Sequence, residues 1–151
     1  MIINNKLLDK EITRKKSSIG CRCSANTTSN STTTPTKLPF SEYIKTGSKL
    51  SLSNNRIYAE KDCTVIIFTQ IYITSGITAN TNGVILNILK NGSQFSRSLN
   101  AIPSNWRTCS CSGVIINLSA GDYIEVGFHS GDKTGITVAS GENTFITVKE
   151  I

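Results

Sequence analysis

The dipeptide Asn91-Gly92 places the tightest constraint on what this chain can fold into. A two-residue hairpin turn of type I′ needs positive φ at both central positions, and Asn followed by Gly adopts that conformation most readily. The runs on either side, Val84–Lys90 and Ser93–Asn100, are bounded by turn-forming residues and carry a β-type pattern. They are therefore expected to pair as the antiparallel strands of a hairpin.

Further short strands are expected on both sides of this hairpin, because Gly, Asn and Asp separate several other β-type runs. Together with the hairpin they predict an all-β fold, an antiparallel two-sheet jelly-roll sandwich that an extended N-terminal arm precedes. No segment of this domain has convincing helical periodicity. The other expected strands are residues 49–52, 56–58, 63–73, 107–118, 123–129 and 144–151.

The basic residues are concentrated near the N-terminus. Most of the formal charge of +6 lies before Leu38, whereas the rest of the chain is nearly neutral. A basic arm on a neutral domain favours contact with an acidic surface of a protein, a nucleic acid or a membrane. We expect three regions, namely a docking arm at residues 1–20, a Ser/Thr/Asn-rich linker at 21–39, and a jelly-roll head domain at 40–151.

The docking arm carries scattered apolar residues among its charges. Leu8, Ile12 and the two lysines that follow could lie along one side of a short helix. An isolated helix of this length is marginal in water and gains stability by docking, although a frayed tail without a partner is the alternative. The residues expected to anchor the arm are Ile2, Ile3, Leu7, Leu8, Ile12, Arg14, Lys15 and Lys16.

Residues 24–36 are almost all Ser, Thr and Asn, which predicts an extended linker with too little apolar area to fold. No apolar run is long enough to span a bilayer, and no membrane partner is expected. The first residues lack the continuous hydrophobic segment of a secretory signal. We therefore expect folding in a cytoplasm, where the five cysteines stay reduced.

The run 63–73 is apolar on both faces, unlike an antiparallel strand with one solvated face. Either loops cover its second face, or that face contacts another subunit. The subunit interpretation is favoured, because a small sandwich has one core and few means of covering two faces. The expected interface residues are Ile66, Phe68 and Tyr72.

Three segments, in their order along the chain, resemble the C1q/TNF-like jelly-roll domain, in particular versions found in tailed-bacteriophage virion proteins. They are the hairpin KNGS, then VIINLSAGDYIEVGF with its apolar strand, Gly-Asp turn and second strand, and finally the terminal strand NTFITVKEI. The resemblance covers residues 47–151. It implies a homotrimer whose aromatic-bearing faces pack on the threefold axis, which would explain the second apolar face of the run 63–73.

The chain departs from this family in two respects. A Ser/Thr/Asn linker stands where animal and spore-coat members often have a collagen-like stalk, and no signal peptide is visible. The second departure puts a secreted ligand in doubt, whereas a phage product released by lysis needs no signal.

The sequence contains no common catalytic motif. His129, the only histidine, cannot supply a triad or a multi-histidine metal site alone, and we expect it to be an exposed residue at a strand end. The acidic residues do not cluster, and the pairs Glu60/Asp62 and Asp122/Glu125 fit turn and solvent positions. No cofactor or metal is predicted, with calcium at Asp122 or Asp132 left as an alternative.

The cysteines form two C-x-C pairs, Cys21/Cys23 and Cys109/Cys111, and leave Cys63 single. Buried structural thiols are favoured over a metal site or an intersubunit or arm-to-head disulfide. Cys63 is expected to be a small buried residue.

Two further features leave alternatives open. The run Arg14-Lys15-Lys16 lacks the interleaved aromatic residues typical of nucleic-acid binding, so protein docking is favoured over nucleic acid. Trp106 would be a carbohydrate platform, a protein anchor or a plug at the end of the sandwich.

The favoured function is a non-enzymatic virion structural protein, assembled in the host cytoplasm. It would be a trimeric head fibre or capsid decoration protein whose arm binds a capsid or tail protein and whose head would bind host surfaces through several weak sites. The alternative is a tail or baseplate receptor-binding protein that attaches to a host glycan or protein. An enzyme such as a glycan depolymerase would need clustered carboxylates on the folded surface.

Overall fold

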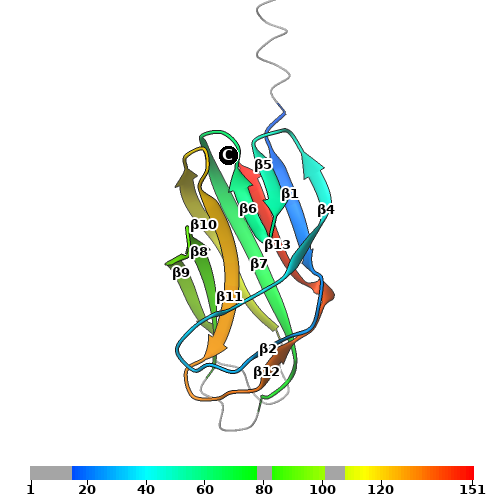
Figure 1. The fold of residues 1–151 in the computed structure, drawn as a ribbon, viewed down its shortest axis with the longest axis vertical. Helices are drawn as coiled ribbons and strands as arrows, with labels where there is room; N and C mark the ends of the chain where they lie inside the picture. The colour runs from blue at the N-terminus through cyan, green and yellow to red at the C-terminus, as the bar shows by residue number, and fades with distance from the viewer. Residues whose placement is uncertain (1–14, 78–82, 101–107) are drawn as a thin grey trace, which may run out of the picture.

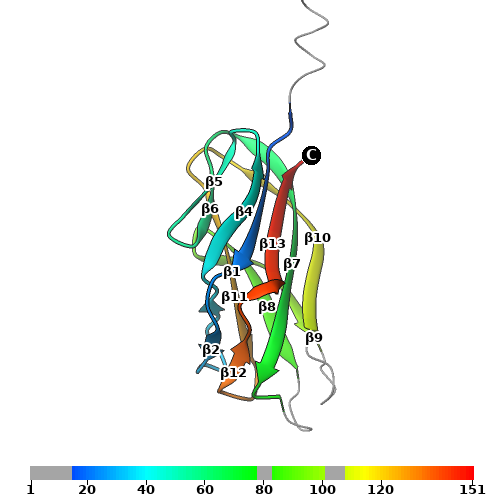
Figure 2. The same ribbon diagram turned by 90° about the vertical axis from the view of Figure 1, so that its right-hand side faces the viewer.

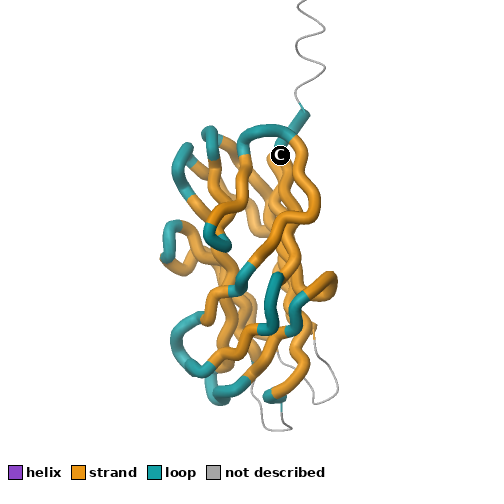
Figure 3. The backbone as a smooth tube through the Cα atoms, turned by 45° about the vertical axis from the view of Figure 1, so that its right-hand side comes forward, coloured by secondary structure: helices purple, strands orange, loops and turns teal. Residues whose placement is uncertain are grey.

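The computed structural model describes residues 15–77, 83–100 and 108–151, which form two antiparallel sheets packed face to face. No helix occurs in these three ranges (Figure 3). The all-β, two-sheet architecture predicted from the sequence is therefore confirmed.

The first sheet, here the front sheet, has β7 at its centre. β13 pairs with one edge of β7 and β10 pairs with the other edge (Figure 2). The strands of this sheet in spatial order are β2 (Thr27–Ser29), β12 (Ile136–Val138), β7 (Cys63–Ser75), β13 (Gly141–Glu150), β1 (Ser18–Cys23) and β4 (Phe40–Thr46), with β10 (Thr108–Leu118) beside β7.

The second sheet, here the back sheet, is built around β11 (Figure 1). The short β3 pairs with the same edge of β11 as β6 does. The strands of this sheet in spatial order are β5 (Leu50–Ser53), β6 (Arg56–Ala59), β11 (Tyr123–Ser130), β8 (Val84–Lys90) and β9 (Ser93–Asn100), with β3 (Thr36–Lys37) beside β11.

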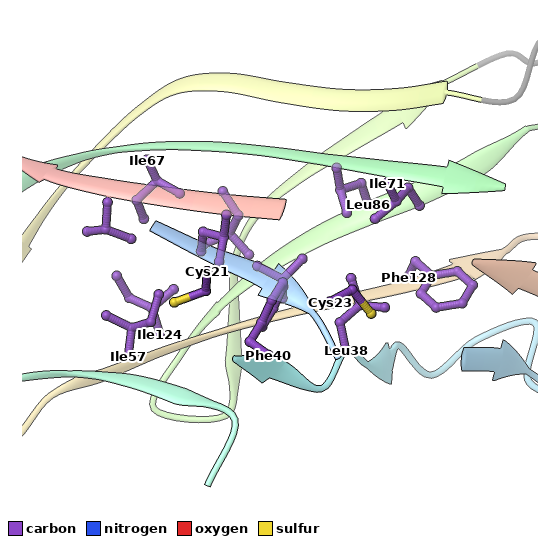
Figure 4. Packing of buried hydrophobic residues seen from close by; sticks show 14 of the residues in the cluster. Cys21, Cys23, Leu38, Phe40, Ile57, Ile67, Ile71, Leu86, Ile124 and Phe128 are labelled. Atoms are coloured by element: carbon purple, nitrogen blue, oxygen red, sulfur yellow. The ribbon is translucent and has the colours of Figure 1, made fainter. Parts of the chain in front are cut away.

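The core fills the space between the sheets with aliphatic and aromatic side chains from both (Figure 4). Ile67 and Ile71 of the front sheet and Ile124 and Phe128 of the back sheet are all at most 1% exposed. Alternate residues of β7 and β11 supply these side chains, as the period-2 pattern of a strand requires. In β10, Ile116 and Leu118 also enter the core, whereas Val114 is only partly buried.

The hairpin at Asn91-Gly92 is also confirmed. Asn91 has φ 52° and Gly92 has φ 80°, so both central residues take the left-handed conformation of a type I′ turn. Strands β8 and β9 have the predicted bounds, and a bulge interrupts their register between Ile88 and Leu89. The other expected strands are present with ends shifted by at most three residues.

The predicted boundary between a linker at 21–39 and a head at 40–151 is wrong. β1 pairs with both β13 and β4, which places it inside the front sheet. Its alternate residues Ile19, Cys21 and Cys23 are at most 2% exposed, and Leu38 also enters the core. The pattern I-G-C-R-C has the alternating apolar residues of a half-buried strand. The basic residues around it made this alternation hard to recognise in the sequence.

The polar segment after β1 is part of the fold because its side chains make specific hydrogen bonds. Thr28 of β2 shares a 2.8 Å hydroxyl contact with Thr137 of β12, and the fully buried Ser29 donates its hydroxyl to the Ser31 carbonyl. Low hydrophobicity therefore did not prevent ordering here, since strand pairing satisfied the backbone.

The chain enters the sandwich beside its C-terminus, at the end opposite β2 and β12 (Figures 1 and 2). Ser17 is 2% exposed, and it donates its backbone N–H to Glu150 Oε2 at 2.9 Å. The Glu150 N–H in turn donates to the Ser17 carbonyl at 2.8 Å. Among the described residues, no helix has the length and apolarity needed to cross a membrane.

Candidate oligomerisation interface

The outer face of the front sheet collects apolar side chains from several strands. Ile66, Phe68 and Tyr72 alternate along β7 with the buried Val65, Ile67 and Ile71, so they point away from the core. Ile66 is directly opposite Ile115 of β10, and directly opposite residues share a face. The three predicted interface residues therefore lie together, and β10 adds a fourth apolar side chain.

The same face continues over β13 and β1. Phe68 is opposite Thr147 of β13, and Thr147 is opposite Gly20 of β1. Two residues before Thr147, on the same face of β13, the half-buried Phe145 is opposite Gln70 of β7. Between Phe68 and Gly20, this face therefore carries the half-buried Thr147.

Gly20 allows the edge strand β4 to lay two side chains across β1. A Cβ atom at Gly20 would lie 2.8 Å from Ile44 Cγ2 and 2.9 Å from Tyr43 Cε1. The guanidinium carbon of Arg22 lies 4.4 Å from the centroid of the Tyr43 ring, which fixes the position of that ring by a cation–π contact. Tyr43 and Ile44 thus extend the apolar row to the edge of the sheet.

We call this set the apolar front surface. Four of its members are well exposed: Phe68 at 39%, Tyr43 at 51%, Ile44 at 55% and Ile115 at 56%. Solvent-exposed apolar side chains gathered on one face are typical of a protein-binding surface, whereas scattered ones need no explanation. Its members are Tyr43, Ile44, Ile66, Phe68, Tyr72, Ile115 and Phe145.

Sequence reasoning found only the β7 part of this surface. Tyr43, Ile44, Ile115 and Phe145 were not predicted, because the pairing that brings their strands together with β7 involves residues far apart in the chain. The run S-E-Y-I-K between two polar segments was a detectable signal for an edge strand. Of the expected anchoring residues, Lys15 and Lys16 are exposed just before β1, and Ile2, Ile3, Leu7, Leu8, Ile12 and Arg14 lie outside the described residues.

The cysteines that the structure describes are packing residues. Cys21, Cys23 and Cys109 are buried free thiols in the core. Burial raises the pKa of Cys21 to about 12, with a further contribution from the Glu42 charge, and burial raises the pKa of Cys109 to about 12. A thiol with so high a pKa is not a nucleophile at neutral pH.

The remaining two cysteines differ from expectation or escape description. Cys63 is half-buried rather than buried, because it begins β7 at the end of the sandwich. The side chain of Cys111 and all of Trp106 lie outside the described residues. Within the described residues, no three Cys, His, Asp or Glu side chains are grouped as a metal site would need.

His129 and Glu125 were expected at the solvent-facing surface, and both predictions are wrong. His129 is 7% exposed and its Nδ1 lies 3.3 Å from Asn87 Nδ2. Burial lowers the pKa of His129, and the positive charge of Arg97 lowers it further. Glu125 is 5% exposed and forms ion pairs with Lys37 and Arg56.

Asp122, which the sequence left open as a calcium ligand, is occupied by protein donors. Asn91 Nδ2 donates to its Oδ1 at 2.7 Å, and the Ser119 N–H donates to its Oδ2 at 2.9 Å. These bonds and the Lys90 ammonium lower the pKa of Asp122 to about 2. The carboxylate therefore serves the turn between β10 and β11.

Comparison with protein-family models and with the curated proteins gave no match. Solved structures do match. Murine APRIL at pH 5.0 superposes with a TM-score of 0.70 and 15% sequence identity, over 91% of this chain and all of that chain. Eiger TNF from S. frugiperda superposes with a TM-score of 0.66 and 12% identity, over 91% of this chain and 94% of that chain.

At these identities the likeness concerns the fold alone. It confirms the antiparallel, C1q/TNF-like jelly-roll sandwich predicted from the sequence, and the match extends over more of the chain than the expected 47–151. The link to bacteriophage proteins stays a prediction.

Proposed function

We propose that this chain is a non-enzymatic subunit of a homotrimer, assembled through the apolar front surface. The observation that carries the proposal is the gathering of exposed apolar side chains from β4, β7 and β10 on one face, while the core between the sheets is already filled. A second copy is the occupant that the sequence resemblance implies, and the TNF-like fold supports it. Closed rings of identical subunits are the common way to bury such a face.

The finer proposal is that the trimer is a head fibre or capsid decoration protein of a phage virion. It is supported by the position of the chain entry, since Ser17 is fixed beside Glu150 at one end of the sandwich. An arm that docks on a capsid or tail protein would leave the opposite end, with β2 and β12, directed outward. The exposed Lys15 and Lys16 at the entry suit an acidic docking surface.

The alternative is a tail or baseplate receptor-binding protein that attaches to a host glycan or protein. It is favoured by a second exposed apolar pair on the back sheet, where Phe95 is 46% and Leu99 is 68% exposed on the edge strand β9. In a trimer that covers the front sheets, these side chains would remain available to a ligand.

Three experiments test the proposal. Light scattering of the purified chain should give three times the monomer mass of 16.4 kDa, and a monomer at micromolar concentration would exclude the trimer. The location and copy number of the chain in a purified particle separate the capsid from the tail role. Removal of residues 1–14 should prevent incorporation without affecting the fold, whereas removal of 1–20 would delete part of β1.

A further inference from the structure

A notch interrupts one side of the back sheet, where two short strands pair in succession with the same edge of β11. β6 is opposite Tyr123 and Ile124, and β3 is opposite Gly127 and Phe128. Glu125 lies between these pairings and lines a depression of about 460 Å³, which is within the size range of small-ligand sites. We call this depression the Glu125 notch.

Two cations hold the buried carboxylate of the notch. Lys37 Nζ donates to Glu125 Oε1 at 2.9 Å, and Arg56 Nε donates to the same oxygen at 3.0 Å. Burial would raise the pKa of Glu125, but the hydrogen bonds from Lys37 and Arg56 outweigh it and hold that pKa below its ordinary value. Two positive charges on one carboxylate leave the notch with an excess positive charge.

Among the described residues, the Lys37 ammonium alone holds the second oxygen of Glu125. Glu125 Oε2 lies 2.9 Å from the Lys37 ammonium as an ion pair, yet it is buried and accepts no hydrogen bond from the described part of the chain. A carboxylate oxygen that lost the ammonium would need a new donor, and a ligand hydroxyl could take that place. If the carboxylate of a ligand drew the Lys37 ammonium outward, Glu125 Oε2 would become accessible to that ligand.

Both cations of the notch are partly exposed to solvent. The side chains of Lys37 and Arg56 are 49% and 35% exposed, and the Arg56 guanidinium carbon lies 4.4 Å from the centroid of the Tyr123 ring. A stacked guanidinium beside an ammonium matches the geometry of a carboxylate ligand. Asn54, also in the notch wall, is exposed and offers both an amide donor and an acceptor.

We propose that the Glu125 notch binds one acidic sugar residue of the uronic-acid kind. Its carboxylate would bind Lys37 and Arg56, and its hydroxyls would bind Glu125 Oε2 and Asn54. The negative charge of Glu125 disfavours densely charged anions such as phosphate, whereas neighbouring hydroxyls can donate to it. The inference rests on the proposed role of the head in binding host surfaces, and it names the ligand class.

The ligand test uses two glycosides that differ in one group. The full-length protein is titrated by NMR with methyl glucuronide and with methyl glucoside, in which a hydroxymethyl group replaces the carboxylate. We expect the glucuronide to bind with a dissociation constant of about 1 mM, weakened by salt, and the glucoside to bind at least about tenfold more weakly. Equal binding of the two, or no glucuronide binding at about 10 mM, would overturn the proposal.

Variants assign the binding to the notch. Lys37→Gln removes one cation while Arg56 still holds Glu125, and Asn54→Gly removes the amide while tolerating the positive φ of 49° at that position. Both should weaken glucuronide binding, by at least about tenfold for Lys37→Gln. Lys61→Gln, the same charge change at an exposed turn residue, should have no effect, and an equal loss there would refute the notch.

A glutamate tetrapeptide serves as the competing ligand. Tighter binding of this peptide than of the glucuronide would also refute the sugar and indicate an acidic protein partner. Light scattering of the same samples keeps the two proposals separate. An intact trimer that does not bind the glucuronide would refute only the ligand proposed for the notch. A monomer that still binds the glucuronide would refute only the trimer.

Discussion

Asn91 and Asp122 tie the β8–β9 hairpin turn of the back sheet to the β10–β11 turn, which connects the front sheet to the back sheet. Asn91 Nδ2 donates to Asp122 Oδ1 at 2.7 Å, and Asn91 Oδ1 accepts the Tyr123 N–H at 2.9 Å. Asn91 thus forms the β8–β9 turn through its backbone and binds the β10–β11 turn through its side chain. The residue that the type I′ turn selects for its backbone conformation therefore has a second, tertiary role.

Replacement Asn91→Ala should destabilise the fold more than a turn substitution alone, because two hydrogen bonds are lost, one of them to a charged group. Asn54→Ala is the matched control. Asn54 also has positive φ, 49° against 52° at Asn91, so both variants carry similar backbone strain. Urea unfolding of the two variants measures the difference, and equal losses would show that the tertiary bonds contribute nothing.

The assembly prediction compares two phenylalanines. Phe68→Asp places a charge in the apolar front surface and should dissociate the trimer, with an increase in dissociation constant of at least about 100-fold. Phe68 is 39% exposed in the single chain, so the monomer should remain folded. Light scattering and circular dichroism measure the two effects.

Phe95→Asp is the control for this substitution, since Phe95 is 46% exposed but lies on β9 of the back sheet. It should leave the trimer intact. Dissociation by Phe95→Asp with an intact Phe68→Asp trimer would place the interface on β9 instead of on the front sheet.

The sequence was most informative where local rules and tertiary structure agree. The Asn91-Gly92 turn and the strands beside it followed from backbone conformation alone, and the alternation along β7 placed Ile66, Phe68 and Tyr72 on one face. β1 was missed because its apolar residues are Ile19 and two cysteines between basic residues. Its strand character depends on pairing with β13, the last strand of the chain.

The burial of Glu125 and His129 could not be predicted, because it depends on contacts distant in sequence. Glu125 is covered by Lys37, 88 residues away, and His129 contacts Asn87, 42 residues away. The alternation along β11 places both residues opposite the core face, which ordinarily means exposure. The strand β3, formed from an apparently unstructured segment, provides part of that cover.

His129 should make stability depend on pH between about 7 and 5. Its pKa is lowered in the folded protein by burial and by Arg97, whereas the pKa of the histidine in the unfolded chain is about 6.5. The unfolded state therefore binds more protons below that pH, so this contribution to stability is present above about pH 6.5 and is lost as the pH falls. Because it is the only histidine, His129→Gln should reduce the change of the urea unfolding midpoint with pH over this range. An unchanged pH dependence would contradict the assignment to His129.

Gly20 should control the shape of the apolar front surface. A Cβ at this position would meet Ile44 Cγ2 at 2.8 Å and Tyr43 Cε1 at 2.9 Å, and both atoms belong to side chains that can move toward solvent. Gly20→Ala should therefore leave the monomer folded but displace Tyr43 and Ile44, and so weaken the trimer by about tenfold or more. Gly131→Ala is the matched control, because a Cβ there meets no atom within 4 Å. Sedimentation at a series of concentrations measures both variants, and an unchanged Gly20→Ala trimer would exclude β4 from the interface.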